Sequence, residues 1–265
     1  MSISEYWADH SRRFANFNFV YPVISRRARG LSVGINCTPN GVCSFNCIYC
    51  QVYGVRPTHS VPTVDDIMNE LKRLLSIYNE TKFAEYFPGV EEKDRMLKDI
   101  ALSGDGEPTL YPYFVRLCAA VRAHCDTPLV LITNAAQIPE GLEHLTEIWG
   151  KLDAGTDDFL QSINRPRKKI DIAEIENNLK HIVLKFSLRI QTMLCKVPSE
   201  AEIESYAKVV QRIYEANPEN LLGVQLYSVA RQAVESAVKP LPRSFLEYVK
   251  GKLLEINSKL LVEVF

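Results

Sequence analysis

The chain has 265 residues, of which 46% are hydrophobic and 24% are charged, an ordinary composition for a globular protein with a sizeable core. The formal net charge of −1 argues against a globally basic nucleic-acid coat, so nucleic acid as a partner depends on local basic patches alone. No apolar run approaches the ~18 residues of a transmembrane helix, which excludes a membrane-spanning segment, and the first 14 residues lack the apolar core of a secretory signal. Seven cysteines, three of them within eight residues, favour a metal site in the reducing cytoplasm over a disulfide framework.

Predicted strands and helices alternate along most of the chain. A helix over residues 4–15 comes first, and a first strand follows at residues 30–36. The sequence from Thr63 to Asp66 resembles a capping box with aspartate in its last position, and apolar residues then recur at helical spacing. Further strands are expected at residues 99–103, 129–133, 151–154, 186–194, 222–227 and 259–265. Further helices are expected at residues 113–124, 141–149, 156–163, 171–184, 199–216 and 244–257.

This alternation predicts βαβ units and a parallel sheet, and therefore the α/β class. Six or seven such units in a chain of this length favour a partial (βα)6-type TIM barrel over a doubly wound sheet. We assign residues 1–29 to a short N-terminal extension and residues 30–265 to a single barrel domain. In such barrels the active site lies at the C-terminal ends of the strands, so the loops that follow the strands should carry the chemistry.

The first of these loops contains Cys43, Cys47 and Cys50 in a C-x3-C-x2-C arrangement. Three thiolates on one loop can converge on a single soft metal centre. A tetrahedral zinc ion would need a fourth ligand, and no C-x2-C or H-x3-H partner is visible in the sequence. On a [4Fe–4S] cluster, three cysteines leave one iron without a protein ligand, and that iron can bind a substrate or cofactor. Structural thiols or a zinc clip are the alternative.

The three cysteines, with Tyr49 just before the last of them, resemble the signature of the radical S-adenosylmethionine superfamily. Segments at later strand ends strengthen the resemblance: residues 103–109, which include Asp105, Gly106 and Glu107 in place of a Gly-Gly-Glu motif, residues 133–134, 151–155 and 163–166. The pattern is similar to a subgroup that includes wybutosine-type tRNA-modifying enzymes and many uncharacterised Fe–S oxidoreductases. It covers about residues 32–227.

The resemblance implies two cofactors, a [4Fe–4S] cluster on the three cysteines and S-adenosylmethionine. Reductive cleavage of S-adenosylmethionine gives methionine and a 5′-deoxyadenosyl radical, which abstracts hydrogen from a substrate such as an RNA nucleoside, a peptide or a small metabolite. The resemblance also implies a flavodoxin-like or ferredoxin-like electron donor. The residues expected to bind S-adenosylmethionine are Tyr49, Asp105, Gly106, Glu107, Asn134 and Asp153.

Tyr49, Asn134 and Asp153 each have a plainer alternative. The Tyr49 ring is expected near the adenine, or it is plain packing. Gly106 allows a close backbone approach, and Glu107 suits the methionine ammonium group. Asn134 is a candidate for the ribose or carboxylate of the cofactor, or a turn residue. Asp153 is a candidate acceptor for a ribose hydroxyl, or a solvated turn residue.

The substrate side of the predicted barrel is polar but unspecific. Period-two alternation places polar residues on one face of the strands at 186–194 and 222–227. A polar face inside a barrel suggests ligand contacts, and an edge strand with one wet face is the alternative. No residue is assigned as catalytic. The candidates to face the substrate are Arg189, Gln191, Gln225 and Tyr227.

Two short basic groups are candidates for contact with RNA phosphates, although a solvated charged loop is the alternative. They are Arg26, Arg27 and Arg29 before the first strand, and Arg165, Arg167, Lys168 and Lys169 after Asn164. Only Cys37 lies upstream of the motif, so a second cluster is not expected. Two other functions stay open: an activating enzyme that installs a radical on a partner protein, and a non-catalytic Fe–S electron-transfer protein.

Overall fold

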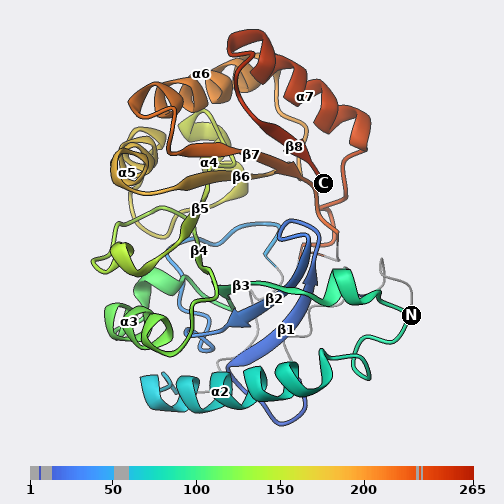
Figure 1. Cartoon of the computed structure of the whole chain (residues 1–265). Helices are drawn as coiled ribbons and strands as arrows, with labels where there is room; N and C mark the ends of the chain where they lie inside the picture. The colour runs from blue at the N-terminus through green and yellow to red at the C-terminus, as the bar shows by residue number, and fades with distance from the viewer. Residues whose placement is uncertain (1–5, 7–13, 51–59, 231–232, 234) are drawn as a thin grey trace. The chain divides into compact units, whose positions relative to one another are not determined.

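The computed structural model describes residues 6, 14–50, 60–230, 233 and 235–265, which form two compact units (Figure 1). The first unit comprises Met1–Val42, Arg56–Leu131 and Pro139–Thr146, and the second comprises Cys43–Val55, Ile132–Ile138 and Glu147–Phe265. The helix expected over residues 4–15 lies almost wholly outside the described residues. No helix in the described part of the chain is both long and apolar enough to cross a bilayer.

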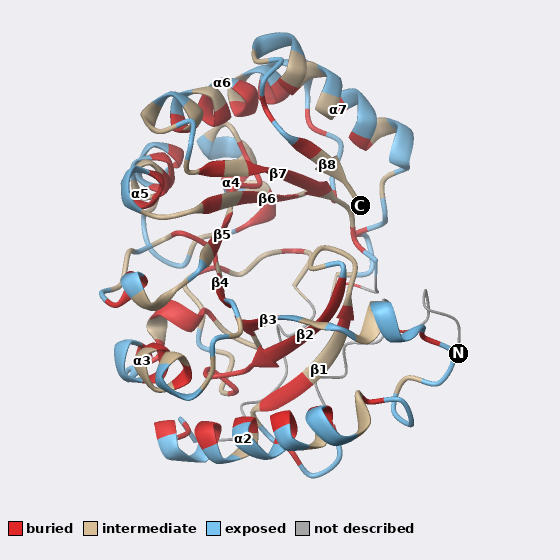
Figure 2. Cartoon of the chain, viewed as in Figure 1, coloured by how far each residue is buried: buried red, intermediate tan, exposed pale blue. Residues whose placement is uncertain are grey.

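The first unit contains β1 (Val20–Ser25), β2 (Gly30–Ile35), β3 (Leu97–Leu102) and the start of β4 (Leu129–Thr133). β1 is antiparallel to β2, whereas β2, β3 and β4 run parallel. Every residue of β2 is buried, as expected for a parallel strand (Figure 2). The sequence predicts no strand within the N-terminal extension of residues 1–29, whereas β1 lies there and pairs with β2. Pro22 explains the difference, because proline weakens a strand prediction and is tolerated on an edge strand.

Two helices belong to this unit, α2 (Val64–Thr81) and α3 (Phe114–His124), and α2 packs against both β1 and α3. The predicted capping box is confirmed at the start of α2. The Asp66 N–H donates to Thr63 Oγ1 at 3.1 Å, and the Thr63 N–H donates to Asp66 Oδ2 at 3.0 Å. The buried side of α2 faces the core of the unit (Figure 2).

The second unit contains β5 (Glu147–Lys151), β6 (Leu188–Met193), β7 (Leu221–Tyr227) and β8 (Val262–Val264), all parallel. Its helices are α4 (Asp157–Ile163), α5 (Ile172–Lys185), α6 (Glu200–Ala216) and α7 (Arg243–Ile256). Helix α6 packs against both α5 and α7. The strands follow the order β1 to β8 along the chain, and their alternation with helices confirms the predicted α/β class.

The helix predicted over residues 141–149 is wrong. Gly141 adopts a left-handed conformation, a short 3-10 helix η3 (Leu142–His144) follows, and strand pairing then begins where the Thr146 N–H donates to Leu129 O at 2.8 Å. Apolar residues at 142, 145, 148 and 149 fit a helical stripe, but Ile148 and Trp149 are buried in β5. β5 therefore starts four residues earlier than expected and ends at Lys151, so Lys151 and Asp153 both lie at its C-terminal end.

Candidate functional site

The cysteine loop, residues 43–50, is clamped in the second unit by the segment that follows α4. Four backbone hydrogen bonds join the two: Ile48 N to Ile163 O at 2.9 Å, Asn46 N to Asn164 O at 3.0 Å and to Arg165 O at 3.1 Å, and Arg167 N to Ser44 O at 2.8 Å. Phe45 and Pro166 add an isolated antiparallel bridge. Paired backbone polar groups hold a loop without regular secondary structure in a defined conformation. The motif is thus tied to the end of α4, more than a hundred residues along the chain.

Side-chain amides donate hydrogen bonds to two of the three cysteine sulfurs. Asn134 Nδ2 lies 3.6 Å from Cys43 Sγ, and Asn164 Nδ2 lies 3.4 Å from Cys47 Sγ. The backbone N–H of Phe45 also donates to Cys43 Sγ, at 3.5 Å. Burial raises the pKa of Cys47 to about 12, and the hydrogen bond from Asn164 partly opposes this effect.

The donor chemistry of this loop fits a soft metal centre. Three thiols stand close together in the sequence, and N–H donors reach sulfur at two of them, an arrangement found around iron–sulfur ligands. Within the described residues, no three histidine, cysteine or acidic side chains stand close enough to one another to hold a metal ion. The cysteine loop therefore fits a cluster in the chemistry of its donor atoms. The three sulfurs would have to move closer together to hold a bound cluster.

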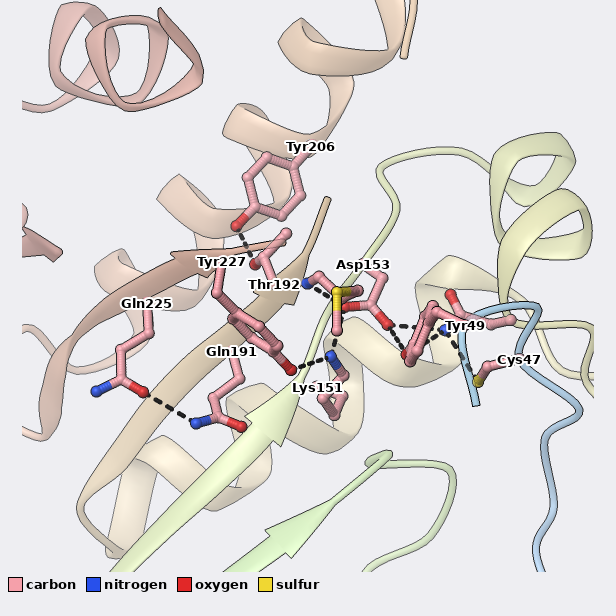
Figure 3. A network of polar contacts seen from close by, with 11 residues as sticks. Cys47, Tyr49, Lys151, Asp153, Gln191, Thr192, Tyr206, Gln225 and Tyr227 are labelled. Carbon is pink, nitrogen blue, oxygen red and sulfur yellow. Dashed lines mark hydrogen bonds and ion pairs between the residues drawn. The ribbon is translucent and has the colours of Figure 1, made fainter. Parts of the chain in front are cut away.

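Asp153 lies at the centre of a buried network in this unit (Figure 3). Its side chain is fully buried, and four donors reach its two oxygens. They are Lys151 Nζ at 2.9 Å and Met193 N at 2.7 Å on Oδ1, with Asn164 Nδ2 at 2.8 Å and Tyr49 OH on Oδ2. A buried carboxylate is stable when it is this fully hydrogen-bonded. The predicted contact between Asp153 and a ribose hydroxyl would have to displace one of these donors.

Lys151 lies between two tyrosines and the Asp153 carboxylate (Figure 3). Its Nζ donates to Tyr227 OH at 2.6 Å and stands 5.1 Å from the Tyr49 ring centroid and 4.8 Å from the Tyr227 ring centroid. Burial by itself lowers the pKa of Lys151, but Asp153 and then Tyr227 outweigh that effect and raise it. Burial, and next the Asp153 charge, holds the pKa of Tyr49 well above its usual range. At neutral pH Lys151 is therefore charged and Tyr49 is neutral.

In the first unit, the loop after β3 packs against the segment that leads into Cys43. Asn36 Nδ2 donates to Asp105 Oδ2 at 2.7 Å, and the Asp105 N–H donates to Asn36 Oδ1 at 3.1 Å. The Glu107 N–H donates to Val42 O at 2.8 Å. A Cβ atom on Gly106 would lie 2.2 Å from the same Val42 O, so only glycine permits this approach.

Glu107 is buried and begins the short helix η2 (Pro108–Leu110). Its Oε1 accepts hydrogen bonds from Thr109 Oγ1 at 2.9 Å and from Thr109 N at 3.3 Å, which makes it the cap of its own turn. Its predicted role toward a methionine ammonium group stays a prediction. Nearby, Thr38 Oγ1 is buried and has no hydrogen-bond partner among the described residues, and the same holds for Asn164 Oδ1 in the second unit. Orphaned buried polar atoms occur where a ligand or water completes the hydrogen bonding.

Of the residues predicted to face the substrate, the two glutamines are buried and bond to each other. Gln191 Nε2 donates to Gln225 Oε1 at 2.9 Å, and both residues are 1% exposed or less (Figure 3). They are direct cross-strand partners in the parallel pair β6–β7. Tyr227, at the C-terminal end of β7, is partly exposed. Tyr227 and Arg189 are thus the two members of the predicted set that are not fully buried.

Arg189 has a structural role in the ion pairs of this sheet. Its Nε lies 2.7 Å from Glu147 Oε1, and its Nη1 lies 3.6 Å from Glu263 Oε2. Arg189 is the second residue of β6, toward the strand's N-terminal end. That position lies opposite the strand ends that carry chemistry in such sheets. The guanidinium therefore bridges β5, β6 and β8.

The two basic groups occupy different places in their units. Arg26, Arg27 and Arg29 lie at the turn of the β1–β2 hairpin, next to the pair Ser25↔Gly30 and at the opposite end of β2 from Asn36. With a rise of about 3.3 Å per residue, six strand residues separate that turn from the loop side by roughly 20 Å. The second group, residues 165–169, adjoins the cysteine loop directly through the Arg167–Ser44 hydrogen bond. Arg165 pairs with Glu235, and Arg167, Lys168 and Lys169 are exposed.

Three residues that hold the network together were not assigned roles from the sequence. Lys151 and Asn164 stood inside motif segments, and their partners became visible only in the folded chain. Glu202 accepts from Gly155 N and from Thr156 Oγ1, each at 2.5 Å, and so fixes the loop after Asp153. An acidic residue in the first turn of a helix is common, so no sequence signal distinguishes Glu202.

Comparison with known proteins gives a consistent result. Residues 38–209 match the family model of the radical SAM superfamily. The chain is 30% identical over 256 residues to a protein named GTPase Obg from Brachyspira hyodysenteriae, covering 92% of this chain and 34% of that protein. It is 30% identical over 184 residues to human S-adenosyl-L-methionine-dependent tRNA 4-demethylwyosine synthase TYW1B, covering 65% of this chain and 27% of that protein. The chain thus spans only about a third or a quarter of these two relatives.

A solved radical SAM methyltransferase from Sphaerobacter thermophilus is similar in fold, with a TM-score of 0.66 at 14% identity over 93% of this chain and 68% of that one. At this level of identity the likeness concerns the fold alone. It supports the partial barrel that the strand and helix pattern predicted.

Proposed function

This chain belongs to the radical SAM superfamily of enzymes, and we propose that it binds a [4Fe–4S] cluster and S-adenosylmethionine in order to start a radical reaction on a substrate. When bound and reduced, the cluster would supply the electron that splits S-adenosylmethionine into methionine and a 5′-deoxyadenosyl radical, which takes a hydrogen atom from the substrate. The observation that carries the proposal is the cysteine loop, with its three thiols and the amide donors at two of the sulfurs.

Cys43, Cys47 and Cys50 would hold the cluster. The clamp after α4 fixes the backbone of their loop, and the orphaned Asn164 Oδ1 offers an acceptor beside it. Tyr49 presents a ring next to Cys50, and that ring is held in place by Asp153. The protein's part is to bind, orient and exclude water around a reactive species.

In this proposal, Tyr227 and Lys151 lie at the part of the site that faces the substrate. Both stand at C-terminal strand ends, and Lys151 keeps its charge because Asp153 faces it at 2.9 Å. The name of the human relative specifies a tRNA synthase, and this chain covers 27% of that protein. A substrate of that kind remains one of several to be screened. The chain lacks the G-x4-G-K-[ST] phosphate loop, so the GTPase in the name of the Brachyspira protein is not part of the proposal.

The test of the proposal is an anaerobic one. The chain is reconstituted with iron and sulfide, reduced with dithionite and given S-adenosylmethionine, and 5′-deoxyadenosine is measured by mass spectrometry. Product from the native chain that disappears in Cys47→Ala supports the proposal. Cys125→Ala is the matched control, because Cys125 lies outside the motif. A well-formed cluster without S-adenosylmethionine binding would instead indicate an electron-transfer protein.

We further propose an electron donor that docks on the basic group 165–169. These residues adjoin the cysteine loop, and a negatively charged flavodoxin-like or ferredoxin-like protein complements their charge. A double variant, Lys168→Glu with Lys169→Glu, should slow reduction by an acidic donor severalfold and leave reduction by dithionite unchanged. Lys185→Glu with Lys259→Glu is the control, because these exposed residues precede β6 and β8. Unchanged reduction combined with weaker RNA binding would assign the patch to nucleic acid.

A further inference from the structure

We infer that Asn134 and Asn164 are positioning residues that raise the reduction potential of the metal centre through N–H···S hydrogen bonds to Cys43 and Cys47. The inference depends on the proposed cluster and adds the means by which this chain tunes it. The two asparagines come from different elements: Asn134 follows β4, and Asn164 is the C-cap of α4.

The amide of Asn134 has one possible orientation. Its Oδ1 accepts from the backbone N–H of Ala136 at 3.0 Å, so the oxygen must face that donor. The NH2 group then points the other way, where it donates to Ser44 Oγ at 2.9 Å and approaches Cys43 Sγ at 3.6 Å. A hydrogen bond to sulfur is longer than one to oxygen because the sulfur atom is larger. The contact therefore places a donor at the thiolate.

Asn164 is oriented by a different partner. Its Nδ2 lies 2.8 Å from Asp153 Oδ2, and an ionised carboxylate only accepts, so the NH2 group must face it. The same nitrogen lies 3.4 Å from Cys47 Sγ. Asp153 cannot move away, since Lys151 and the Met193 N–H hold its other oxygen. The backbone oxygen of Asn164 also accepts from Asn46 N within the cysteine loop. Asn164 is therefore held by Asp153 at its side chain and by the backbone of the cysteine loop at its main chain.

The physical effect follows from charge. One-electron reduction takes [4Fe–4S]2+ and one electron to [4Fe–4S]+, and the added charge spreads onto the sulfurs. An N–H dipole aimed at a ligand sulfur stabilises the more negative state more strongly, so the equilibrium shifts toward the reduced cluster. Second-shell donors of this kind tune metal sites in general. Removing either donor should therefore make the cluster harder to reduce.

The test uses Asn134→Leu and Asn164→Leu, which keep side-chain size and remove the amide. Each reconstituted protein is titrated with dithionite against redox dyes, and the reduced cluster is followed by electron paramagnetic resonance. We expect each variant to lower the equilibrium constant for reduction about three- to tenfold, where tenfold is ~59 mV for one electron. Asn220→Leu is the matched control, because Asn220 Nδ2 donates to Val183 O at 2.9 Å and has no hydrogen bond to a cysteine among the described residues. Its equilibrium constant should equal that of the native chain.

The outcomes separate the inference from the proposed function. A lower equilibrium constant for reduction in both asparagine variants supports the inference, whether or not S-adenosylmethionine is cleaved. Unchanged potentials in variants with full iron content overturn the inference and leave the proposed function intact. If Asn164→Leu loses its cluster because Asp153 loses one of its four donors, Asn134→Leu decides the question. Loss of the cluster from both, with Asn220→Leu intact, also overturns the inference and assigns the amides to cluster assembly.

Discussion

Lys151 and Asp153 form a buried ion pair, with Nζ 2.9 Å from Oδ1, at the end of β5. Their side chains are 13% and 0% exposed. Breaking a buried pair leaves one uncompensated charge, which costs about 3–5 kcal/mol, whereas removing both charges together costs much less. The pair joins the cysteine loop, through Tyr49, to the end of β7, through Tyr227.

Lys151→Met should therefore lower the free energy of unfolding by about 3 kcal/mol, because Asp153 then keeps only neutral donors. Asp153→Asn should cost a similar amount. The double variant should be destabilised by clearly less than the sum, which urea unfolding of all four proteins measures as a coupling free energy. Strict additivity would show that the two charges do not stabilise each other.

Gly106→Ala should destabilise the first unit. The new Cβ would lie 2.2 Å from the backbone oxygen of Val42, so the backbone must shift, at a cost of about 1–3 kcal/mol. Gly251→Ala in α7 is the matched control, because no neighbouring atom of the described chain lies within 4 Å of the position that its Cβ would take. That variant should be neutral or stabilising by up to about 1 kcal/mol. Thermal unfolding compares the two, and equal melting temperatures would contradict the proposed close approach.

Much of the fold could be predicted from the sequence because its signals are local. The capping box at Thr63 and the alternation of strands and helices need only neighbouring residues. The sequence misses β1 and predicts a start for β5 that is four residues too late, because the evidence for these strands is not local. Pro22 hides an edge strand that pairing with β2 reveals, and the apolar spacing around Ile148 suits a helix until tertiary burial decides for a strand.

The candidate site, like the fold, could be predicted from the sequence only in part. The cysteine motif and its strand-end companions were visible from spacing, and the family comparison supports them. The contacts of Asn164 were not visible, because they join residues that lie 11 and 117 positions away in the sequence. Nor could the sequence tell that Gln191 and Gln225 satisfy each other, or that Arg189 is held by two carboxylates. Polar residues on a strand face look alike until their partners are known.

The roles of the Tyr49 ring and of the Tyr49 hydroxyl can be tested separately. Tyr49→Phe keeps the ring and removes the hydrogen bond to Asp153, so stability should fall by about 1 kcal/mol while affinity for S-adenosylmethionine changes little. Tyr49→Ala removes the ring as well, and affinity should fall about tenfold if the ring contacts the cofactor. Equilibrium dialysis of the cluster-loaded proteins measures both. Equal affinity in the two variants would place Tyr49 outside the cofactor site.

Glu176 gives a stability prediction that depends on pH. It joins α5 to α6, with its Oε2 2.6 Å from Arg212 Nη2 and its Oε1 2.6 Å from Lys180 Nζ. The hydrogen bond from Arg212 is the main cause that holds the pKa of this carboxyl below its usual range. A lowered folded-state pKa means that the stabilisation is complete above the unfolded-state pKa of about 4.3 and is lost as the pH falls through the folded value.

Glu176→Gln should therefore lower the free energy of unfolding by about 1 kcal/mol at pH 7, a modest value because Arg212 is 46% exposed. The difference from the native chain should shrink as the pH falls below the unfolded-state pKa of about 4.3 and through the lower folded-state pKa. Urea unfolding at pH 7 and pH 3.5 measures both values. Glu204→Gln, an exposed position on α6, is the matched control and should change stability by less than about 0.5 kcal/mol at either pH. A Glu176→Gln difference that stays constant across this range would show that the carboxylate charge is not what stabilises the α5–α6 contact.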